Sequence, residues 1–240
     1  MRLAIITGGS KGLGLALCQQ FEERGYRVLE FSRTAPHAYS VRADLSAPEA
    51  YAQVVAKAIA PLDADHLEEL VVINNAGTLA PIGPASRQSR SAVLANLNTN
   101  FTSAILGLTE LIGKFQHAPC RKVLANISSG AAHKGYAGWS LYCASKAGME
   151  GFVRALAIEQ QLERHPFIPV NVNPGVIDTE MQALIRDAAV ADFPEVERFI
   201  RRKHEGALVA PERVAMAVLQ ILASPSLASG GGYETSATAG

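Results

Sequence analysis

Short apolar segments alternate with longer helical segments along most of this chain, and that alternation limits the folds open to it. Segments such as residues 3–7 and 70–74 are rich in β-branched residues and bounded by turn residues, which is typical of buried strands. Strands that alternate with helices form a mainly parallel sheet covered on both faces. The sequence therefore predicts an α/β fold with a doubly wound parallel sheet of about seven strands, in one domain over residues 1–240.

The apolar pattern also places the individual elements. Only residues 34–38 separate the second and third predicted strands, too few for a crossover helix, so a turn around Pro36 is expected there. The tail at residues 230–240 is small and polar, and we expect it to be loosely ordered unless it docks. Strands are predicted at residues 3–7, 27–31, 39–43, 70–74, 122–127 and 169–172, and helices at 13–24, 48–60, 91–116, 142–163 and 211–223.

Composition excludes several classes of protein. The 22 Lys and Arg residues balance 22 Asp and Glu residues, which argues against binding to nucleic acid or to an anionic membrane. The histidines lack metal-ligand spacing, and no apolar stretch reaches membrane-spanning length, so neither a metal site nor a membrane anchor is expected. The three cysteines, Cys18, Cys120 and Cys143, form no CxxC pair, which favours a reducing cytoplasm over a disulfide framework.

A glycine-rich turn follows the first predicted strand and opens the first predicted helix. Glycines in this position let the backbone turn tightly and approach a pyrophosphate, while the helix N-terminus offers free N–H groups. The alternative is a tight turn without a ligand. The turn consists of Gly8, Gly9, Ser10, Lys11, Gly12, Leu13 and Gly14.

A second group of small and polar residues, Asn74 to Gly77, ends the fourth predicted strand. Ligands of open α/β sheets bind beyond the carboxyl ends of the strands. We therefore expect Asn75, Ala76 and Gly77 to line the ligand, and Asn74 either to do the same or to tie neighbouring strands together.

Tyr142 and Lys146 lie four residues apart on a predicted helix, and Ser129 lies just past the preceding strand. Residues at this spacing share one helix face. A nearby ammonium group favours the phenolate, so Lys146 is expected to lower the pKa of Tyr142 and make it usable as an acid or base. The Ser129 hydroxyl could donate a hydrogen bond to a carbonyl oxygen that gains negative charge.

These motifs, in this order, resemble those of the short-chain dehydrogenase/reductase family over most of the chain. The family patterns are TGxxxGxG at 7–14, NNAG at 74–77, YxxxK at 142–146 and PGxxxT at 174–179. The resemblance implies a Rossmann fold and a nicotinamide cofactor. It also implies a fourth catalytic residue at Asn100 (Asn98 is the less favoured register) and further cofactor contacts at Asp44, Leu45, Pro174, Gly175, Ile177 and Thr179. Asp44 has an alternative role as the N-cap of the helix at 48–60.

The end of the second predicted strand bears on which nicotinamide cofactor binds. Sites that prefer NADH place an acid there for the ribose hydroxyls. Here Ser32 and Arg33 follow Phe31 instead, and Lys11 adds a second positive charge. Both cations could pair with a 2′-phosphate, so NADPH is expected in preference to NADH, unless they are merely solvated.

For a member of this family, the motifs imply hydride transfer to a bound ketone or aldehyde. Tyr142 would supply the proton, Lys146 would bind the ribose, Ser129 would orient the carbonyl, and Asn100 would hold a water that resupplies the proton. Substrate contacts are expected after Ser129 and in residues 180–203, which could fold over the site as a lid or simply pack. The candidates are Gly130, Tyr136, Trp139, Met181, Leu184 and Phe199.

Residues 127–132, 138–143 and 175–182 resemble the branch that contains benzil reductases and sepiapterin reductases. We rank a vicinal diketone reductase first, a pterin reductase second and a 3-oxoacyl thioester reductase third. Glu234 could take the place of the acid that anchors a pterin, although that acid is usually an aspartate. A non-catalytic NADP(H) sensor is the alternative of another class. Family members assemble through the helices that correspond to 91–116 and 142–163, so a homodimer or homotetramer is expected.

Overall fold

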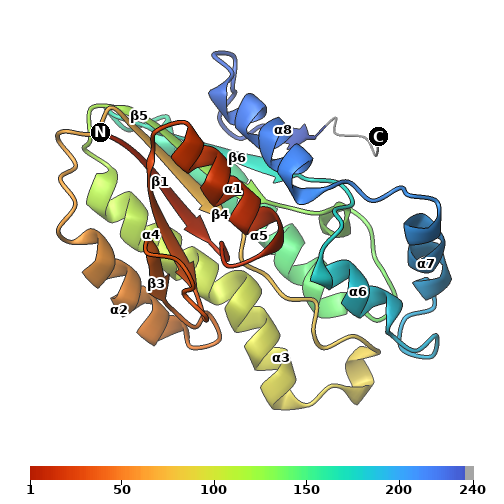
Figure 1. Ribbon diagram of the computed structural model, residues 1–240. Helices are drawn as coiled ribbons and strands as arrows, with labels where there is room; N and C mark the ends of the chain where they lie inside the picture. The colour runs from red at the N-terminus through yellow and green to blue at the C-terminus, as the bar shows by residue number, and fades with distance from the viewer. Residues whose placement is uncertain (236–240) are drawn as a thin grey trace.

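The computed structural model describes residues 1–235, which form a seven-stranded parallel sheet flanked by helices (Figure 1). The strand order is β3-β2-β1-β4-β5-β6-β7, so the direction of winding reverses between β1 and β4. Such a reversal is where open α/β sheets bind ligands. The strands are β1 (Arg2–Thr7), β2 (Arg27–Ser32), β3 (Ser40–Arg42), β4 (Glu69–Asn74), β5 (Arg121–Ile127), β6 (Phe167–Asn173) and β7 (Gly232–Glu234).

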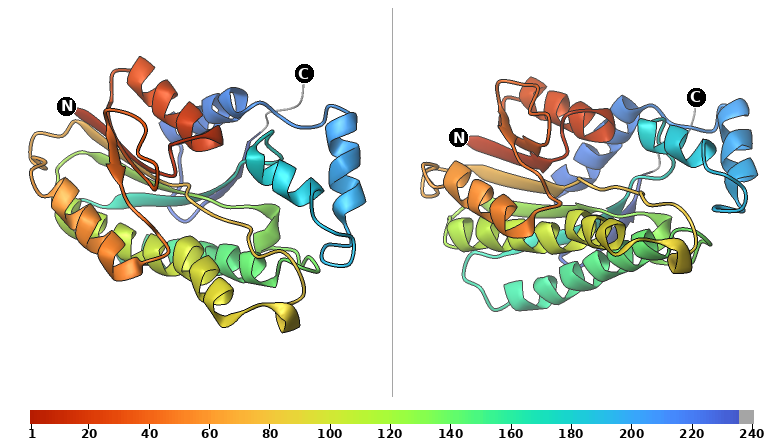
Figure 2. Two further views of the ribbon diagram at one scale, coloured as in Figure 1. Left: turned by 60° about the horizontal axis from the view of Figure 1, so that its bottom comes forward. Right: turned by 90° about the horizontal axis from the view of Figure 1, so that it is seen from below.

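Helices cover both faces of the sheet, as Figure 2 shows. Helices α1 (Gly12–Glu23) and α8 (Pro211–Ala223) pack on one face, and α2 (Pro48–Ile59), α4 (Ser103–Phe115) and α5 (Ser140–Gln160) pack on the other. Successive side chains of a strand point to opposite faces, so the apolar strands supply two separate cores. In β1, Leu3 and Ile5 enter the core under α2, α4 and α5, while Ala4 and Ile6 enter the core under α1 and α8. The doubly wound Rossmann fold expected from the sequence is confirmed.

The long helix predicted at residues 91–116 is interrupted. It is divided into α3 (Arg90–Leu97), a π-helical turn (Asn98–Thr102) and α4. Tertiary hydrogen bonds accompany the interruption, because the Asn98 side-chain amide donates to the Ser46 carbonyl (3.1 Å) and the Ser103 hydroxyl donates to the Leu45 carbonyl (2.6 Å). Apolar periodicity alone does not reveal such contacts. π-Helical turns occur often at functional sites, and this one carries Asn100.

The start of the tail docks on the sheet, which is the condition under which order is expected. Residues Gly232–Glu234 form β7, which pairs in parallel with β6, and the Gly230 N–H donates to the Pro169 carbonyl at 2.7 Å. Three residues are too few for a strand pattern to be recognised in the sequence. Residues 236–240 of the predicted tail lie outside the described part of the chain. The turn predicted between β2 and β3 is confirmed, since no helix lies in residues 33–39.

Two short helices, α6 (Glu180–Arg186) and α7 (Val196–His204), lie beyond the carboxyl ends of the strands, apart from the layers that cover the sheet (Figure 1). We refer to residues 180–204 as the lid segment. In residues 1–235, none of the helices combines the length and the apolar character needed to cross a bilayer.

Candidate active site

The glycine-rich turn after β1 has room only for glycine at its critical positions. Gly8 and Gly12 have positive φ angles of 72° and 55°, which other residues rarely adopt. A Cβ atom on Gly14 would lie 2.0 Å from the Gly8 carbonyl oxygen, so any side chain there would push α1 away from the turn. Within the described residues, no side chain caps the start of α1, and its first N–H groups are free to bind an anion. The turn therefore fits a dinucleotide pyrophosphate.

The turn is held against β4 by Thr7 and Asn75. The Thr7 hydroxyl oxygen accepts hydrogen bonds from the backbone N–H groups of Asn75 and Ala76, both at 3.0 Å. The Asn75 side-chain amide donates to the carbonyl oxygens of Thr7 (3.0 Å) and Gly8 (3.2 Å). Asn75 therefore shapes the glycine-rich turn, and Ala76 packs closely against it, since a Cβ on Gly8 would lie 2.9 Å from the Ala76 Cα.

Sequence reasoning missed Glu30, a fully buried carboxylate in β2. One of its oxygens accepts a hydrogen bond from the Gly9 N–H at 2.9 Å, and the other accepts from the Ser32 hydroxyl at 3.2 Å. Glu30 thus lies beneath the glycine-rich turn and fixes it from inside. The signal in the sequence is an acid in an otherwise apolar strand, which a buried partner must compensate.

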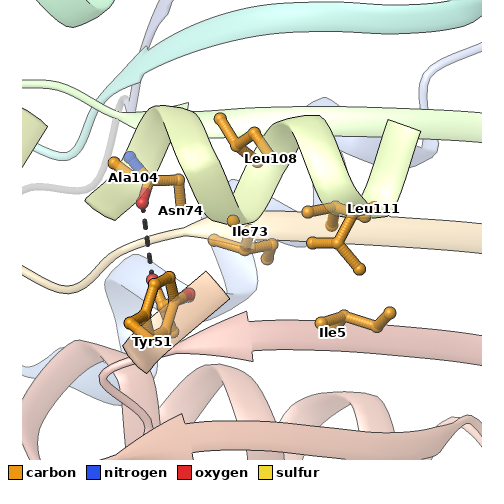
Figure 3. A pocket seen from close by; sticks show the side chains of 10 residues that line it. Ile5, Tyr51, Ile73, Asn74, Ala104, Leu108 and Leu111 are labelled. Carbon is orange, nitrogen blue, oxygen red and sulfur yellow. Dashed lines mark hydrogen bonds between the residues drawn. The ribbon is translucent and has the colours of Figure 1, made fainter. Parts of the chain in front are cut away.

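A row of asparagine side chains crosses the sheet at the strand ends. The Asn74 amide donates to the Asn126 oxygen (3.0 Å), and the Asn126 amide donates to the Asn171 oxygen (2.8 Å). Figure 3 shows Asn74 at the edge of a small core space beneath α4, where the Thr7 hydroxyl also meets its oxygen at 3.5 Å. Of the two roles considered for Asn74, the structure supports the tying of neighbouring strands. The apolar space itself lies inside the core, under Leu108 and Leu111 (Figure 3).

Asn100 is buried in the π-helical turn, with its side chain fixed at both ends. Its oxygen accepts from the Thr78 N–H at 2.7 Å, and its amide donates to the Thr78 carbonyl at 2.8 Å. A Cβ atom placed on Gly77 would lie 3.3 Å from the Asn100 oxygen and 3.9 Å from the Lys146 nitrogen. Asn100 therefore converges with Lys146 beside Gly77, whereas Asn98 points to Ser46.

Ser129, Tyr142 and Lys146 are brought together by β5 and α5. Ser129 precedes the 3-10 turn at Gly130–Ala132, where its hydroxyl oxygen accepts from the Ala131 N–H at 3.2 Å, and it lies near enough to Tyr142 to act on the pKa of the phenol. The Lys146 ammonium donates to the Ile127 carbonyl at 2.7 Å and lies 5.7 Å from the centre of the Tyr142 ring. Both Tyr142 and Lys146 are buried, so the three predicted catalytic side chains share one desolvated site with Asn100.

Burial dominates the titration of this pair. It raises the pKa of Tyr142 to about 12, against a lowering effect of Ser129. Burial also lowers the pKa of Lys146 to about 8, opposed by the negative charge of Glu150. The expectation that Lys146 gives Tyr142 a lowered pKa is therefore wrong for this structure, because burial of the phenol disfavours its charged form and has the largest influence on its pKa. Tyr142 is held as a neutral phenol that can donate a proton.

The residues expected near an adenosine ribose lie at the ends of β2 and β3. Arg33 is exposed, and its charge helps the hydrogen bonds from Ser46 to lower the pKa of Asp44. Asp44 accepts from the Ser46 N–H at 2.9 Å and does not cap α2, whose N-cap is Ala47. The expected alternative role of Asp44 as an N-cap is therefore wrong.

Other residues expected beside them are used differently. Lys11, in the glycine-rich turn, forms an ion pair with Glu180 at the start of the lid segment. The Ser32 side chain is directed toward Glu30, and Leu45 and Leu13 are buried in the two cores. Arg33 is thus left as the exposed cation at the end of β2, while Lys11 connects the cofactor turn to α6.

The PGxxxT segment after β6 reaches the glycine-rich turn. Gly175 has a φ angle of 73°, and the Pro174 carbonyl accepts a hydrogen bond from the Thr235 hydroxyl at 3.0 Å. Ile177 forms a bridge with Val209, and Thr179 begins α6. A Cβ on Gly12 would lie 3.2 Å from the Thr179 methyl carbon, so two motifs 167 residues apart face the same space.

An aromatic cluster adjoins Tyr142 on the other side. Trp139 stacks on Phe193 with ring centres 4.5 Å apart and an angle of 3°, and its ring lies 6.1 Å from that of Tyr142. Phe199, Tyr136 and Met181 pack in the same cluster, whereas Leu184 is 44% exposed and lies outside it. Gly130 is exposed, with open space where a side chain would extend. Phe193 and Phe199 pack mainly against Trp139, so the lid segment closes on an aromatic surface next to the catalytic phenol.

Contacts around Gly138 dock the lid segment. Arg87 forms an ion pair with Asp192 at 2.9 Å and donates to the Ala191 carbonyl, also at 2.9 Å. Gly138 has a φ angle of 86°, and a Cβ there would lie 2.1 Å from the Asp192 carbonyl oxygen. A side chain at position 138 would therefore separate the lid segment from the Trp139 loop.

Glu234 lies on β7, where it accepts a hydrogen bond from the Asn173 side chain at 3.0 Å. It also borders a hollow between α8 and β7, lined by Gln220, Ile221 and Tyr233. These contacts give Glu234 a role in holding the end of β6. Among residues 1–235, His, Cys, Asp and Glu side chains do not gather into a group of three that could bind a metal ion.

A family model described as short chain dehydrogenase matches residues 2–189. The chain belongs to the short-chain dehydrogenase/reductase family of oxidoreductases. It is 38% identical over 228 residues to "Benzil reductase ((S)-benzoin forming)" of Bacillus subtilis (strain 168), with 92% of this chain and 93% of that protein covered. It is 30% identical to "Sepiapterin reductase" of Xenopus tropicalis, with 95% and 94% covered. The crystal structure of the KRED1-Pglu enzyme has a TM-score of 0.80 at 25% identity, with 97% and 100% covered.

Proposed function

We propose that this short-chain dehydrogenase/reductase is an NADPH-dependent carbonyl reductase that acts on small ketones, with vicinal diketones such as benzil preferred. The observation that carries the proposal is the convergence of Ser129, Tyr142, Lys146 and Asn100 in one buried site beside the glycine-rich turn. A protein that only sensed the nucleotide would need the turn but not a buried phenol with a buried lysine beside its ring. The relationship to benzil reductase supports the choice of substrate.

The chain's own residues would hold the cofactor and manage the proton. The glycine-rich turn and the first N–H groups of α1 fit the pyrophosphate, Thr179 lies against this turn at Gly12, and Lys146 lies beside Gly77. Pro174, Gly175 and Ile177 of the same PGxxxT segment would add contacts to the cofactor. Bound NADPH would supply the hydride. Ser129 would orient the carbonyl oxygen and Tyr142, a neutral phenol here, would donate a proton to it. Asn100 would hold a water that restores the proton.

The cofactor preference rests on charge at the end of β2. Arg33 is exposed there, and the acid in that strand, Glu30, is turned inward to Gly9. An exposed guanidinium at the end of a strand whose own acid is turned inward favours a 2′-phosphate over a ribose diol. Lys11 would also bind the 2′-phosphate only if it left its ion pair with Glu180.

The aromatic cluster supports a diketone with aryl groups. Trp139 is buried, and its indole N–H has no hydrogen-bond partner within residues 1–235. A buried N–H without an acceptor lowers the stability of the fold, and a ligand oxygen that accepts from it would remove that cost. The second oxygen of a vicinal diketone is a suitable acceptor. Aromatic side chains around it would pack against the aryl rings.

NADPH oxidation at 340 nm tests the function with benzil, sepiapterin and a 3-oxoacyl ester, each with NADPH and NADH. We expect the highest kcat/KM for benzil with NADPH. Higher activity with sepiapterin or the thioester analogue would favour the corresponding alternative. Protein that binds NADPH and reduces none of the three would favour the sensor.

We also propose a homodimer or homotetramer that forms through α3, α4 and α5. Leu94, Ile158 and Leu162 on and just after these helices are more than half exposed, at 59%, 66% and 89%. Burial of such apolar side chains favours association. Analytical ultracentrifugation would give the assembly state.

We further propose a cytoplasmic location. The three cysteines form no CxxC pair and no disulfide framework, which favours a reducing compartment.

A further inference from the structure

Glu150 is a buried carboxylate that the motifs do not include. It lies one helical turn after Lys146 on α5, so Tyr142, Lys146 and Glu150 follow one another along the same face of the helix. Only 8% of its side chain is exposed. A carboxylate at such depth is expected to be retained only when charged and polar groups compensate for its lost hydration.

The partners of Glu150 come from three elements. One oxygen accepts from the Ser128 hydroxyl at 2.5 Å and lies 3.2 Å from the His133 ring nitrogen. The other lies 3.3 Å from the Arg154 guanidinium. The titratable or charged groups in contact with the Glu150 carboxylate are therefore Arg154 on α5 and His133 after the turn at Gly130–Ala132, while Asn171 of β6 donates to the Glu150 backbone carbonyl at 3.5 Å. Lys146 lies one helical turn earlier, and its ammonium and the Glu150 carboxylate are bound to the adjacent residues Ile127 and Ser128.

Lys146 needs this negative charge more than Arg154 does. The side chain of Arg154 is 58% exposed, so water stabilises its charge, and the side chain of His133 is 67% exposed. Lys146 is buried, and its ammonium donates to a neutral carbonyl oxygen, that of Ile127. We propose that Glu150 is a positioning residue whose buried carboxylate keeps Lys146 as an ammonium ion in the catalytic site. The proposed effect of Glu150 on the protonation of Lys146 is independent of the proposed function, and only the role of Lys146 in the reaction rests on that function.

The test follows the titration of Lys146 in the protein without cofactor or substrate. The side-chain nitrogen of Lys146 is observed by NMR in protein labelled with 15N-lysine and assigned with Lys146→Met. Glu150→Gln keeps the size and the oxygen acceptor but removes the charge. We expect its Lys146 midpoint to fall by about one pH unit relative to the wild type, as for the loss of a nearby opposite charge. Glu150→Asp should restore most of the shift.

Glu159→Gln is the matched control, because Glu159 lies on the same helix and is exposed. It should leave the midpoint unchanged. If Glu150→Gln proves insoluble, the wild type supplies a second measurement: the Glu150 side-chain carboxyl 13C signal should inflect at the midpoint of Lys146. The proposal would be overturned by an unshifted Lys146 midpoint in Glu150→Gln, or by a wild-type Glu150 carboxyl signal without an inflection at the midpoint of Lys146.

The kinetic counterpart separates this role from a purely structural one. In Glu150→Gln the pH at which NADPH-dependent reduction begins to decline should fall by the same interval, with KM for the carbonyl unchanged. A uniform loss of rate at every pH would indicate a structural role and contradict the proposal. Because the NMR titration needs no substrate, its result stands even if no carbonyl compound is reduced.

Discussion

The carboxyl ends of β4, β5 and β6, which we call the catalytic edge because the proposed catalytic residues lie beside them, and the lid segment, which packs against Tyr142, are held by different forces. At the edge, Asn74, Asn126 and Asn171 are buried and joined by directional hydrogen bonds of 2.8 to 3.0 Å. The lid segment is attached through the stack of Phe193 on Trp139 and the partly exposed ion pair of Arg87 with Asp192.

The difference has a physical consequence. Directional bonds between buried amides fix atomic positions, because each misplaced group would lose a partner without gaining water. Aromatic contacts and exposed ion pairs favour closure but tolerate displacement, since they depend weakly on angle or are partly solvated. We expect substitutions at the edge to change chemistry and stability, and substitutions at the lid to change substrate affinity.

The largest effect is expected for Tyr142→Phe, which removes the hydroxyl and keeps the ring. Loss of a general acid typically costs on the order of 10²–10⁴ in rate. We expect kcat to fall by about three orders of magnitude, with NADPH affinity measured by fluorescence titration nearly unchanged. Retention of more than a tenth of the wild-type kcat would remove Tyr142 from the proposed role.

Breaking the asparagine row should cost the most in folding stability. Asn126→Leu would leave the Asn74 amide and the Asn171 oxygen without their shared partner. Since each unsatisfied buried group costs about 1–3 kcal/mol, we expect the free energy of unfolding in urea to fall by about 2–4 kcal/mol. Gln19→Leu, which replaces an exposed amide, is the control and should change stability little. Equal effects would contradict the importance assigned to the row.

The pH dependence of the reduction rate should be set by Lys146 at the catalytic edge and not by the lid segment. Lys146, with its pKa lowered to about 8 by burial, is charged below that pH and neutral above it. The rate of reduction should therefore fall as the pH rises through about 8, approaching tenfold per pH unit. The same group binds fewer protons in the folded than in the unfolded chain between its two pKa values, so its contribution to stability rises with pH there. A lid variant whose rate declines at a different pH would show that the two regions are coupled.

Undocking the lid should mainly weaken substrate binding. Gly138→Ala introduces a Cβ at a φ of 86°, only 2.1 Å from the Asp192 carbonyl. A displacement costing about 1.4 kcal/mol of closure would raise KM for the carbonyl about tenfold, since that free energy equals a factor of ten. Gly130→Ala adds the same methyl group where no atom lies within 4 Å, and its KM should stay close to the wild type. Identical KM values for the two variants would argue against the lid.

The smallest effect is expected for Arg87→Gln. The Arg87 and Asp192 side chains are 56% and 38% exposed, and exposed ion pairs contribute about 0–1 kcal/mol. KM should rise less than fivefold in low salt and should approach the wild-type value in 0.5 M NaCl, where the wild-type pair is itself screened. A larger effect that persists in high salt would mean that Arg87 contacts the substrate.

Much of the fold and of the site could be predicted from local patterns. Period and composition placed the strands β1, β2, β4, β5 and β6, because a strand buried on both faces must be apolar throughout. The shared position of Tyr142 and Lys146, two of the proposed catalytic residues, was predictable because YxxxK spacing places them on one helix face wherever that helix lies. The glycines of the phosphate turn were predictable because few other residues fit that backbone.

Other features depend on neighbours that are distant in the chain. The π-helical turn that carries Asn100 coincides with hydrogen bonds to residues 45 and 46, and β7 exists only as an addition to the edge of β6. The use of Glu30 beneath Gly9 and the pairing of Lys11 with Glu180 were likewise invisible to local patterns.

The sequence alone determined which residues could do chemistry, since spacing within one helix or one turn is a local property. Only the tertiary structure decided their charge states. Whether Tyr142 is a phenol or a phenolate, and whether Lys146 keeps its proton, depends on the burial of both groups and on a carboxylate one turn away. Desolvation is set by the packing of the whole chain around a group, and no local spacing encodes it.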